Sequence, residues 1–277
     1  MNSLATTLPQ QLGRLASSPP LELALAAGVG LIGGVFSGLC GVSPGGTLVV
    51  LSTLVLGAEQ HLAQGISLAA QVPPTSISGV ARYRKEGAGC PLGWLSWIGS
   101  GFLLGGTGGA IGAARVSSSA LQWSYVAYLG ILDAMLILRS SAQPGASNTT
   151  DFGAELRTRA PALFAAGLLA GLSSGYLGIG GGLAIVAGLA AGLKVPQHQA
   201  QLISLVLSII PTTIPAAYIY WRAGFLPSWP ALIAVIVGLW AGTDLGARAA
   251  HRVSETTLRR VLIIMVSTMT AYMAWKA

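Results

Sequence analysis

Charged residues are scarce in this chain of 277 residues: they make up 8% of it, whereas hydrophobic residues make up 53%. A soluble domain averages about 25% charged residues, so the composition excludes a soluble globular protein and predicts an integral membrane protein. The net charge of +7 therefore does not indicate a nucleic-acid partner, because Lys and Arg between apolar runs serve to orient membrane proteins. The polar first twenty residues lack the charge pattern of a cleavable signal peptide, and none is expected.

Residues that carry catalytic or metal chemistry are equally few. Two cysteines, Cys40 and Cys90, support neither a disulfide framework nor a metal site. The three histidines are scattered, and His61 and His198 are expected to be solvated at loop ends. A Walker motif, a CxxC pair and a Ser-His-Asp set are all missing from the sequence. We therefore expect a protein that is not an enzyme, uses no ATP and holds no cofactor or metal.

Long apolar runs are what the sequence has in abundance. A membrane-spanning helix takes about 20 apolar residues, which predicts an all-α, multi-pass protein of the cell membrane. A polar linker, expected in the cytoplasm at residues 140–159, divides a first membrane repeat, 21–139, from a second, 160–277. The predicted segments lie near 21–57, 62–82, 91–113, 120–139, 160–193, 199–221, 228–250 and 257–275.

The two halves align on each other at an offset of 137 positions. Ile66-Ser67-Leu68 meets Ile203-Ser204-Leu205, and Arg115-Val116-Ser117 meets Arg252-Val253-Ser254. Apolar sequences match by chance, but matched polar residues are harder to explain that way. The pattern indicates an internal duplication. The two glycine clusters align at an offset of 136 positions, one less than the rest, which predicts a slip of one residue.

Each half carries a glycine cluster inside its first apolar run, at residues 38–46 and 175–182. Residues 21–57 would form a helix of about 55 Å, too long for one simple crossing of a hydrocarbon core of about 30 Å. A helix broken at the cluster is one way that transporters build a binding site. Close helix packing through small residues is the alternative explanation.

The distribution of Lys and Arg favours one of two topologies. If the first segment of each half crosses once, the repeats are parallel and the two sides hold nine and six cations. If it turns back at the glycines, each half is a broken hairpin plus three crossings, and the repeats are inverted. One side then holds four cations, Arg14, Arg115, Arg222 and Lys276, and the other holds the remaining eleven of the 15. The clearer bias favours inverted repeats with both termini outside.

The second glycine cluster carries a family resemblance. Gly171 through Gly182, followed by Ala200-Gln201-Leu202-Ile203-Ser204, resembles the sulfite exporter TauE/SafE family of membrane anion transporters, and the likeness covers nearly the whole chain. The resemblance implies a small anionic substrate, such as sulfite, sulfoacetate or a related organosulfonate. The first cluster departs from the family pattern at Ser43-Pro44, so two related but unequal half-sites are expected.

Two kinds of group are candidates for binding this anion. Where a half-helix begins in a glycine cluster, its first backbone amides are unpaired and lie at the positive end of the helix dipole. Hydroxyl and amide side chains at a spacing of three to four residues follow on the second helix of each half, although such side chains also bond back to their own helix. The candidates are Ser43, Gly45, Gly46, Thr47, Ser67, Gln71, Thr75, Gly180, Gly181, Gly182, Ser204, Ser208 and Thr212.

Two acids within apolar runs, Asp133 and Asp244, are candidates for carrying a coupling proton. An ion pair of Asp244 with Arg248 is the alternative. The leading hypothesis is a secondary transporter that exports a small sulfur-containing anion by alternating access, coupled to the proton gradient. A passive anion channel on the same fold is the competing hypothesis. The expected partners are the substrate and the lipid bilayer, and a homodimer remains open.

Overall fold

The computed structural model describes residues 19–40, 42–74, 80, 92–138, 156–189, 193, 195, 197–250 and 255–277. Every regular element in these residues is a helix, which confirms the all-α class for this part of the chain. Thr75 and most of the predicted linker lie outside the described residues. The helices are α2 (Pro19–Cys40), α3 (Gly45–Val55), α4 (Gln60–Ala70), α6 (Leu92–Ala113), α7 (Ser118–Leu138), α8 (Leu156–Leu177), α9 (Gly182–Ala187), α10 (Gln197–Ile209), α11 (Ile214–Arg222), α12 (Trp229–Ala250) and α13 (Glu255–Lys276).

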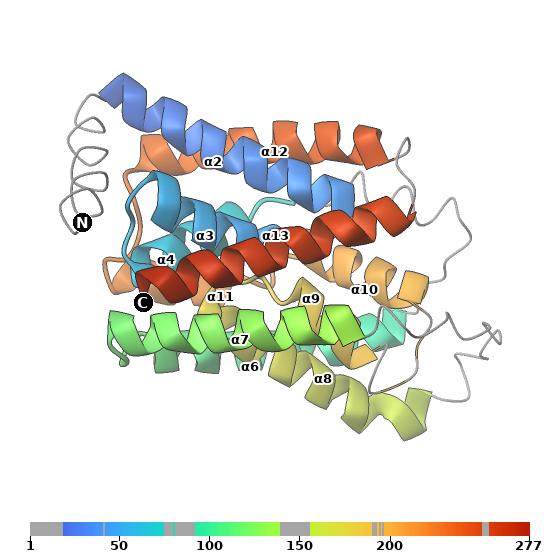
Figure 1. Cartoon of the computed structure of the whole chain (residues 1–277). Coiled ribbons are helices and arrows are strands. Elements are labelled where there is room, and N and C mark those ends of the chain that lie inside the picture. Colours follow the sequence, from blue (N-terminus) through green and yellow to red (C-terminus); the bar gives the residue numbers. More distant parts are fainter. Residues whose placement is uncertain are drawn as a thin grey trace.

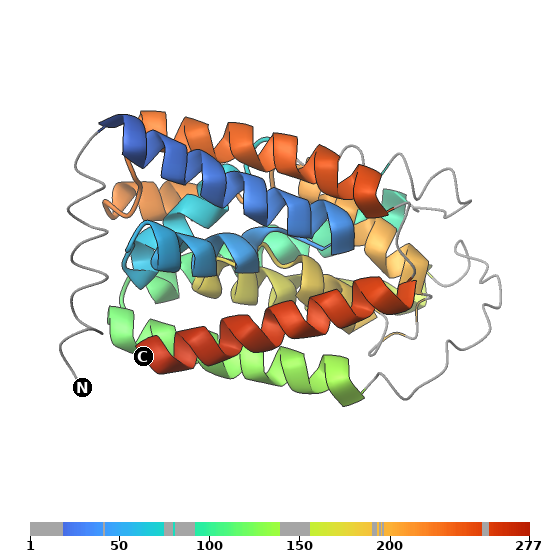
Figure 2. The same cartoon turned by 45° about the horizontal axis from the view of Figure 1, so that its top comes forward.

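The long helices pack as pairs that join the two halves of the chain. α2 packs along α12, α6 along α8, and α7 along α13 (Figure 1). The short helices α3, α4, α9, α10 and α11 lie between these pairs, as the turned view also shows (Figure 2). The broken segments are therefore enclosed by long helices, in the middle of the molecule.

Rows of glycine bring the paired helices into backbone contact. A Cβ atom built on Gly34 of α2 would overlap the carbonyl oxygen of Leu239 in α12, so only glycine fits at this helix spacing. The same overlap with a carbonyl oxygen recurs along both faces of two helix pairs, and it is the close approach that small residues allow in membrane helices. The glycine rows are Gly30, Gly34 and Gly38 of α2; Gly238, Gly242 and Gly246 of α12; Gly101, Gly105 and Gly109 of α6; and Gly167, Gly171 and Gly175 of α8.

The helix boundaries repeat at the offset found in the sequence. α2 and α8 begin 137 residues apart and end 137 residues apart, and so do α6 and α12. The starts of α3 and α9, of α4 and α10, and of α7 and α13 are separated by the same 137 positions. The glycine rows keep this offset too, since Gly34 corresponds to Gly171.

Each half contains a helix break at its glycine cluster, as predicted. α3 begins at Gly45 after α2 ends, and α9 begins at Gly182 after α8 ends. These two starts are 137 positions apart, so the predicted slip of one residue is wrong. That prediction matched glycine with glycine, whereas the residues before the two helix starts are Pro44 and Gly181, which both occupy the N-cap position.

The second apolar segment of each half is broken as well. α4 ends at Ala70, and α10 and α11 meet at a bend of 49° at residues 210–213. Proline explains the bend, because Pro211 offers no amide to a continuing helix. Thr212 lies beyond the end of α10, so the prediction that it continues the helical face of Ser204 and Ser208 is wrong.

Several helices are suited to crossing a bilayer. In the described residues, α2, α8 and α12 are long and apolar enough to span a membrane, and the bent pair α10–α11 makes up to four. α6, α7 and α13 have similar lengths of 22, 21 and 22 residues. The predicted number of crossings stays a prediction.

Candidate functional site

The two glycine breaks, one from each half, meet in the middle of the protein. The Ser67 hydroxyl of α4 donates to the carbonyl oxygen of Gly178, at 2.6 Å, and lies 3.1 Å from that of Gly45. A Cβ atom on Gly45 would overlap the backbone of Ile179. One buried serine therefore binds both breaks, and the two loops touch through glycine.

Gln71 extends this contact into a buried polar cluster. The Ser43 hydroxyl donates to Gln71 Oε1 at 2.7 Å, and Gln71 Nε2 donates to the Ser67 carbonyl oxygen at 2.9 Å. Gly180 lies directly against this pair, because a Cβ atom there would overlap both Gln71 Oε1 and Ser43 Oγ. The φ of +75° at Gly180 also favours glycine. Side chains of the first half thus fill space that a glycine of the second half leaves open.

The second half repeats part of this arrangement. Ser204 donates to the carbonyl oxygen of Gly182 at 3.2 Å, as Ser67 approaches that of Gly45, and each pair is 22 residues apart. Ser208, which corresponds to Gln71, donates back to the Ser204 carbonyl oxygen at 2.9 Å. The short Ser208 side chain makes no equivalent contact with the opposite break, so the two half-sites are related but unequal.

Hydroxyl groups near the start of α3 are also engaged within the protein. Thr47 donates to the Pro44 carbonyl oxygen at 3.0 Å, and the Tyr125 hydroxyl of α7 donates to the Gly46 carbonyl oxygen at 2.8 Å. A Cβ atom on Gly46 would meet only the Tyr125 oxygen, at 3.7 Å, so this glycine has space around it. Gly181, by contrast, has a φ of +66° and packs against the ring of Phe102.

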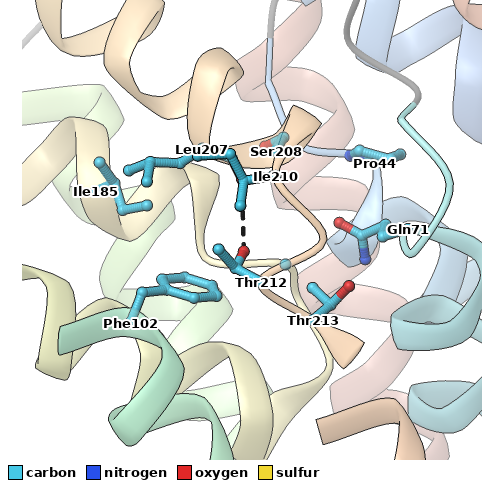
Figure 3. Close-up of a pocket in the computed structure, with 10 residues that line it drawn as sticks. Pro44, Gln71, Phe102, Ile185, Leu207, Ser208, Ile210, Thr212 and Thr213 are labelled. Carbon is cyan, nitrogen blue, oxygen red and sulfur yellow. Dashed lines mark hydrogen bonds between the residues drawn. The ribbon is translucent and has the colours of Figure 1, made fainter. Parts of the chain in front are cut away.

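A small pocket lies where the breaks meet. The space open to a water-sized sphere is about 10 Å³, close to the minimum needed for one water molecule. Figure 3 shows Gln71 and Thr213 on one side, and Phe102, Ile185 and Leu207 on the other. The lining residues are Pro44, Gln71, Phe102, Gly180, Ile185, Leu207, Ser208, Ile210, Thr212 and Thr213. None of these ten carries a charge, and four of them, Gln71, Ser208, Thr212 and Thr213, have polar side chains.

Three helices begin at this pocket. Pro44 is the N-cap of α3, Gly180 directly precedes the N-cap of α9, and Thr213 is the N-cap of α11. The unpaired amides at a helix start carry partial positive charge, which favours an anion. α9 has only six residues, so α3 and α11 contribute most of this field.

Of the predicted site residues, Gln71, Gly180, Ser208 and Thr212 line the pocket. The other described candidates do not line the pocket. They take part in the hydrogen bonds and close contacts around the two helix breaks. Thr213 and Phe102 also line the pocket but were not among the predicted site residues. The helix bend at residues 210–213 brings both Thr212 and Thr213 to the pocket, and hydrophobic periodicity does not give the position of the bend.

Comparison with known proteins identifies the family of this chain. The family model "Sulfite exporter TauE/SafE" matches residues 26–273. The chain belongs to the TauE/SafE family. It is also similar to "Probable membrane transporter protein YdhB" of Bacillus subtilis (strain 168), with 28% identity over 242 residues, covering 83% of this chain and 91% of that protein. No solved structure matches. This TauE/SafE protein is thus a multi-pass membrane transporter.

The two acids of this TauE/SafE protein have different surroundings. Asp133 of α7 accepts from the Ser267 hydroxyl of α13 at 2.8 and 2.9 Å, in a partly buried contact between the two helices. Asp244 forms an ion pair with Arg248 at 2.6 Å, and both side chains are more than half exposed. The alternative explanation for Asp244, an ion pair one helical turn away, is therefore confirmed.

His61 is buried, so the prediction of a solvated loop residue is wrong. Its ring nitrogens lie 2.8 Å from Ser118 Oγ and 3.0 Å from the Ala113 carbonyl oxygen, and its ring stacks on Phe225 with centroids 4.5 Å apart. Only 5% of the residue is exposed. The turn between α6 and α7 folds over the start of α4, and these contacts give His61 a structural role.

Proposed function

We propose that this protein is a secondary transporter that exports a small sulfur-containing anion, such as sulfite, sulfoacetate or a related organosulfonate. The observation that carries the proposal is the convergence of the α3 and α11 starts on one uncharged pocket in a member of the TauE/SafE family. Helix starts attract an anion without a buried cation, and release it more readily than a permanent ion pair does.

We also propose that the halves, 21–139 and 160–277, are inverted repeats. The common offset of the helix starts supports a repeat. The chain directions support inversion, because Figure 1 draws α2 and α7 running from left to right and their counterparts α8 and α13 from right to left. With the linker 140–159 in the cytoplasm of a bacterial cell, eleven of the 15 cations fall on that side of the inner membrane, in agreement with the positive-inside rule.

The size of the pocket supports alternating access rather than a continuous pore. A space of about 10 Å³ is close to the minimum for one water molecule, so a larger solute does not fit at the site without movement of the surrounding residues. Transport then requires the pairs α2–α12 and α6–α8, each of which contains one helix from each half, to move relative to one another about the breaks, so that the pocket opens on each side in turn. The glycine rows of α2–α12 and α6–α8 are natural rigid units for this motion, because their backbones are in contact.

Coupling to the proton gradient needs a group that exchanges a proton during this motion. Asp133 is the stronger candidate of the two acids, since it lies between α7 and α13, one helix from each half, and has a hydroxyl rather than a cation as its partner. Asp244 is neutralised by Arg248 at the surface.

The experiment is counterflow in proteoliposomes. Vesicles preloaded with unlabelled sulfite or sulfoacetate should accumulate the labelled anion transiently, with saturable kinetics, and a pH gradient should drive net flux. Conductive, unsaturable flux without counterflow would support the channel instead. Empty vesicles, and vesicles with a protein inactivated at Gly180→Val, serve as controls for leakage.

A further inference from the structure

Thr213 is an unusual N-cap residue. It precedes the first residue of α11 with φ −84° and ψ −10°, and its side chain makes no capping hydrogen bond. An N-cap threonine normally accepts a bond from the amide of the second or third helical residue. Here the second helical residue is Pro215, which has no amide hydrogen, and the Thr213 side chain makes no capping bond to the third. The Thr213 hydroxyl therefore does not cap α11.

Within the described part of the chain, the hydroxyl has no other partner either. Thr213 is 7% exposed, and its Oγ1 atom is buried without a hydrogen bond. The other polar side chains of the pocket differ in this respect. Ser208 donates to the Ser204 carbonyl oxygen and Thr212 to that of Leu207 at 3.5 Å, while Gln71 gives its amide to Ser67.

A buried hydroxyl without a partner destabilises a protein, so a ligand that accepts a hydrogen bond from Thr213 at the pocket wall would be stabilised there. The position supplies the rest of the chemistry. Thr213 stands at the start of a nine-residue helix, whose dipole favours negative charge. The opposite wall, Phe102, Ile185 and Leu207, is apolar.

We propose that the Thr213 hydroxyl donates a hydrogen bond to an oxygen of an oxyanion head group bound at the start of α11, with the remainder of the ligand against the apolar wall. The end of the pocket that binds the anion then lies in the second half of the chain, at the α10–α11 bend, and not at the glycine clusters. The proposal rests on the proposed function, since it specifies how that transporter recognises its anion.

The test compares three variants by isothermal titration of the purified full-length protein with sulfite and with sulfoacetate. Thr213→Val keeps the shape and removes the hydroxyl, and Thr213→Ser keeps the hydroxyl. Thr243→Val is the matched control, because Thr243 is also 7% exposed but donates to the Leu239 carbonyl oxygen within α12. A hydrogen bond to a charged group corresponds to a change in Kd of roughly ten- to a hundredfold. Thr213→Val should show that loss, whereas Thr213→Ser and Thr243→Val should stay within about threefold of the unmodified protein.

Thermal unfolding without ligand separates this role from a structural one. Thr213→Val should melt no lower than the unmodified protein, because it removes an unsatisfied buried hydroxyl, and Thr243→Val should melt lower because it loses a bond. Unchanged affinity in Thr213→Val would overturn the inference and leave the proposed function standing. If the unmodified protein binds neither anion, the proposed substrate class fails, and the inference fails with it. Should Thr213→Val not fold, the same comparison between Thr213→Ala and Thr213→Ser decides.

Discussion

The glycine rows make the sharpest prediction about how this fold is held together. In Gly34→Ala the new methyl group would overlap the Leu239 carbonyl oxygen and lie 2.8 Å from the Thr243 amide nitrogen. Both atoms belong to the backbone, so no side-chain rotation relieves the contact. A carbon normally stays about 3.3 Å or more from such atoms, and α2 and α12 must therefore separate.

The expected cost follows from two opposing effects. Overpacking of this kind destabilises by about 1–3 kcal/mol, whereas alanine stabilises a helix by about 1 kcal/mol relative to glycine. Gly28→Ala in the same helix isolates the second effect, because a Cβ atom on Gly28 has nothing within 4 Å. The difference between the two variants should then be the overpacking term alone, about 1–3 kcal/mol.

The assay is thermal unfolding of the purified protein in detergent, followed by tryptophan fluorescence. Gly34→Ala should melt several degrees below Gly28→Ala. Gly171→Ala should lose as much as Gly34→Ala, because its methyl group would overlap the Phe102 carbonyl oxygen and lie 2.8 Å from the Gly106 amide nitrogen. The reasoning is refuted if Gly34→Ala melts at or above Gly28→Ala.

Three further predictions concern the site and its supports. Gly181→Ala should reduce both stability and sulfite binding, since φ is +66° at this position and an L-residue there costs about 1–2 kcal/mol. Gly46→Ala should retain both, and equal behaviour of the two variants in thermal-shift titrations would contradict this prediction. Asp133→Asn should abolish flux driven by a pH gradient in proteoliposomes but preserve counterflow, and Asp244→Asn should change neither; loss of counterflow in Asp133→Asn would point to a binding or folding defect instead. His61→Ala should lower stability by about 2–3 kcal/mol through lost hydrogen bonds and stacking, whereas a melting temperature equal to that of the unmodified protein would mean that the contacts contribute nothing.

The sequence predicted the breaks and the repeat well, because glycine and proline act locally. A cluster such as residues 175–182 disrupts a helix in any environment, and two clusters at nearly the same offset indicate a repeat. The offset of 137 then recurs in the helix boundaries. The alignment failed only at Pro44, where a residue of a different type takes the N-cap position of Gly181.

The details of the pocket depend on tertiary geometry that periodicity does not contain. A regular spacing suggested that Thr212 follows Ser204 and Ser208 on one face, but the bend after Ile209 rotates the chain and brings Thr213 to the pocket wall. His61 was misjudged for a related reason. Its burial comes from the α6–α7 turn, which is distant in sequence.

The contact between Gly180 and Gln71 constrains how the two halves can have diverged. Positions 43 and 180 correspond at the common offset, and so do positions 71 and 208. A serine at 180 would collide with Gln71 and Ser43, so a chain built from two copies of the first half could not close here. In two copies of the second half, a glycine would stand at position 43 and a serine at position 71, and these smaller residues would leave a void. If both halves descend from one ancestral repeat, their substitutions at these positions must have been mutually compensating, and exchanging either half alone would break the transporter.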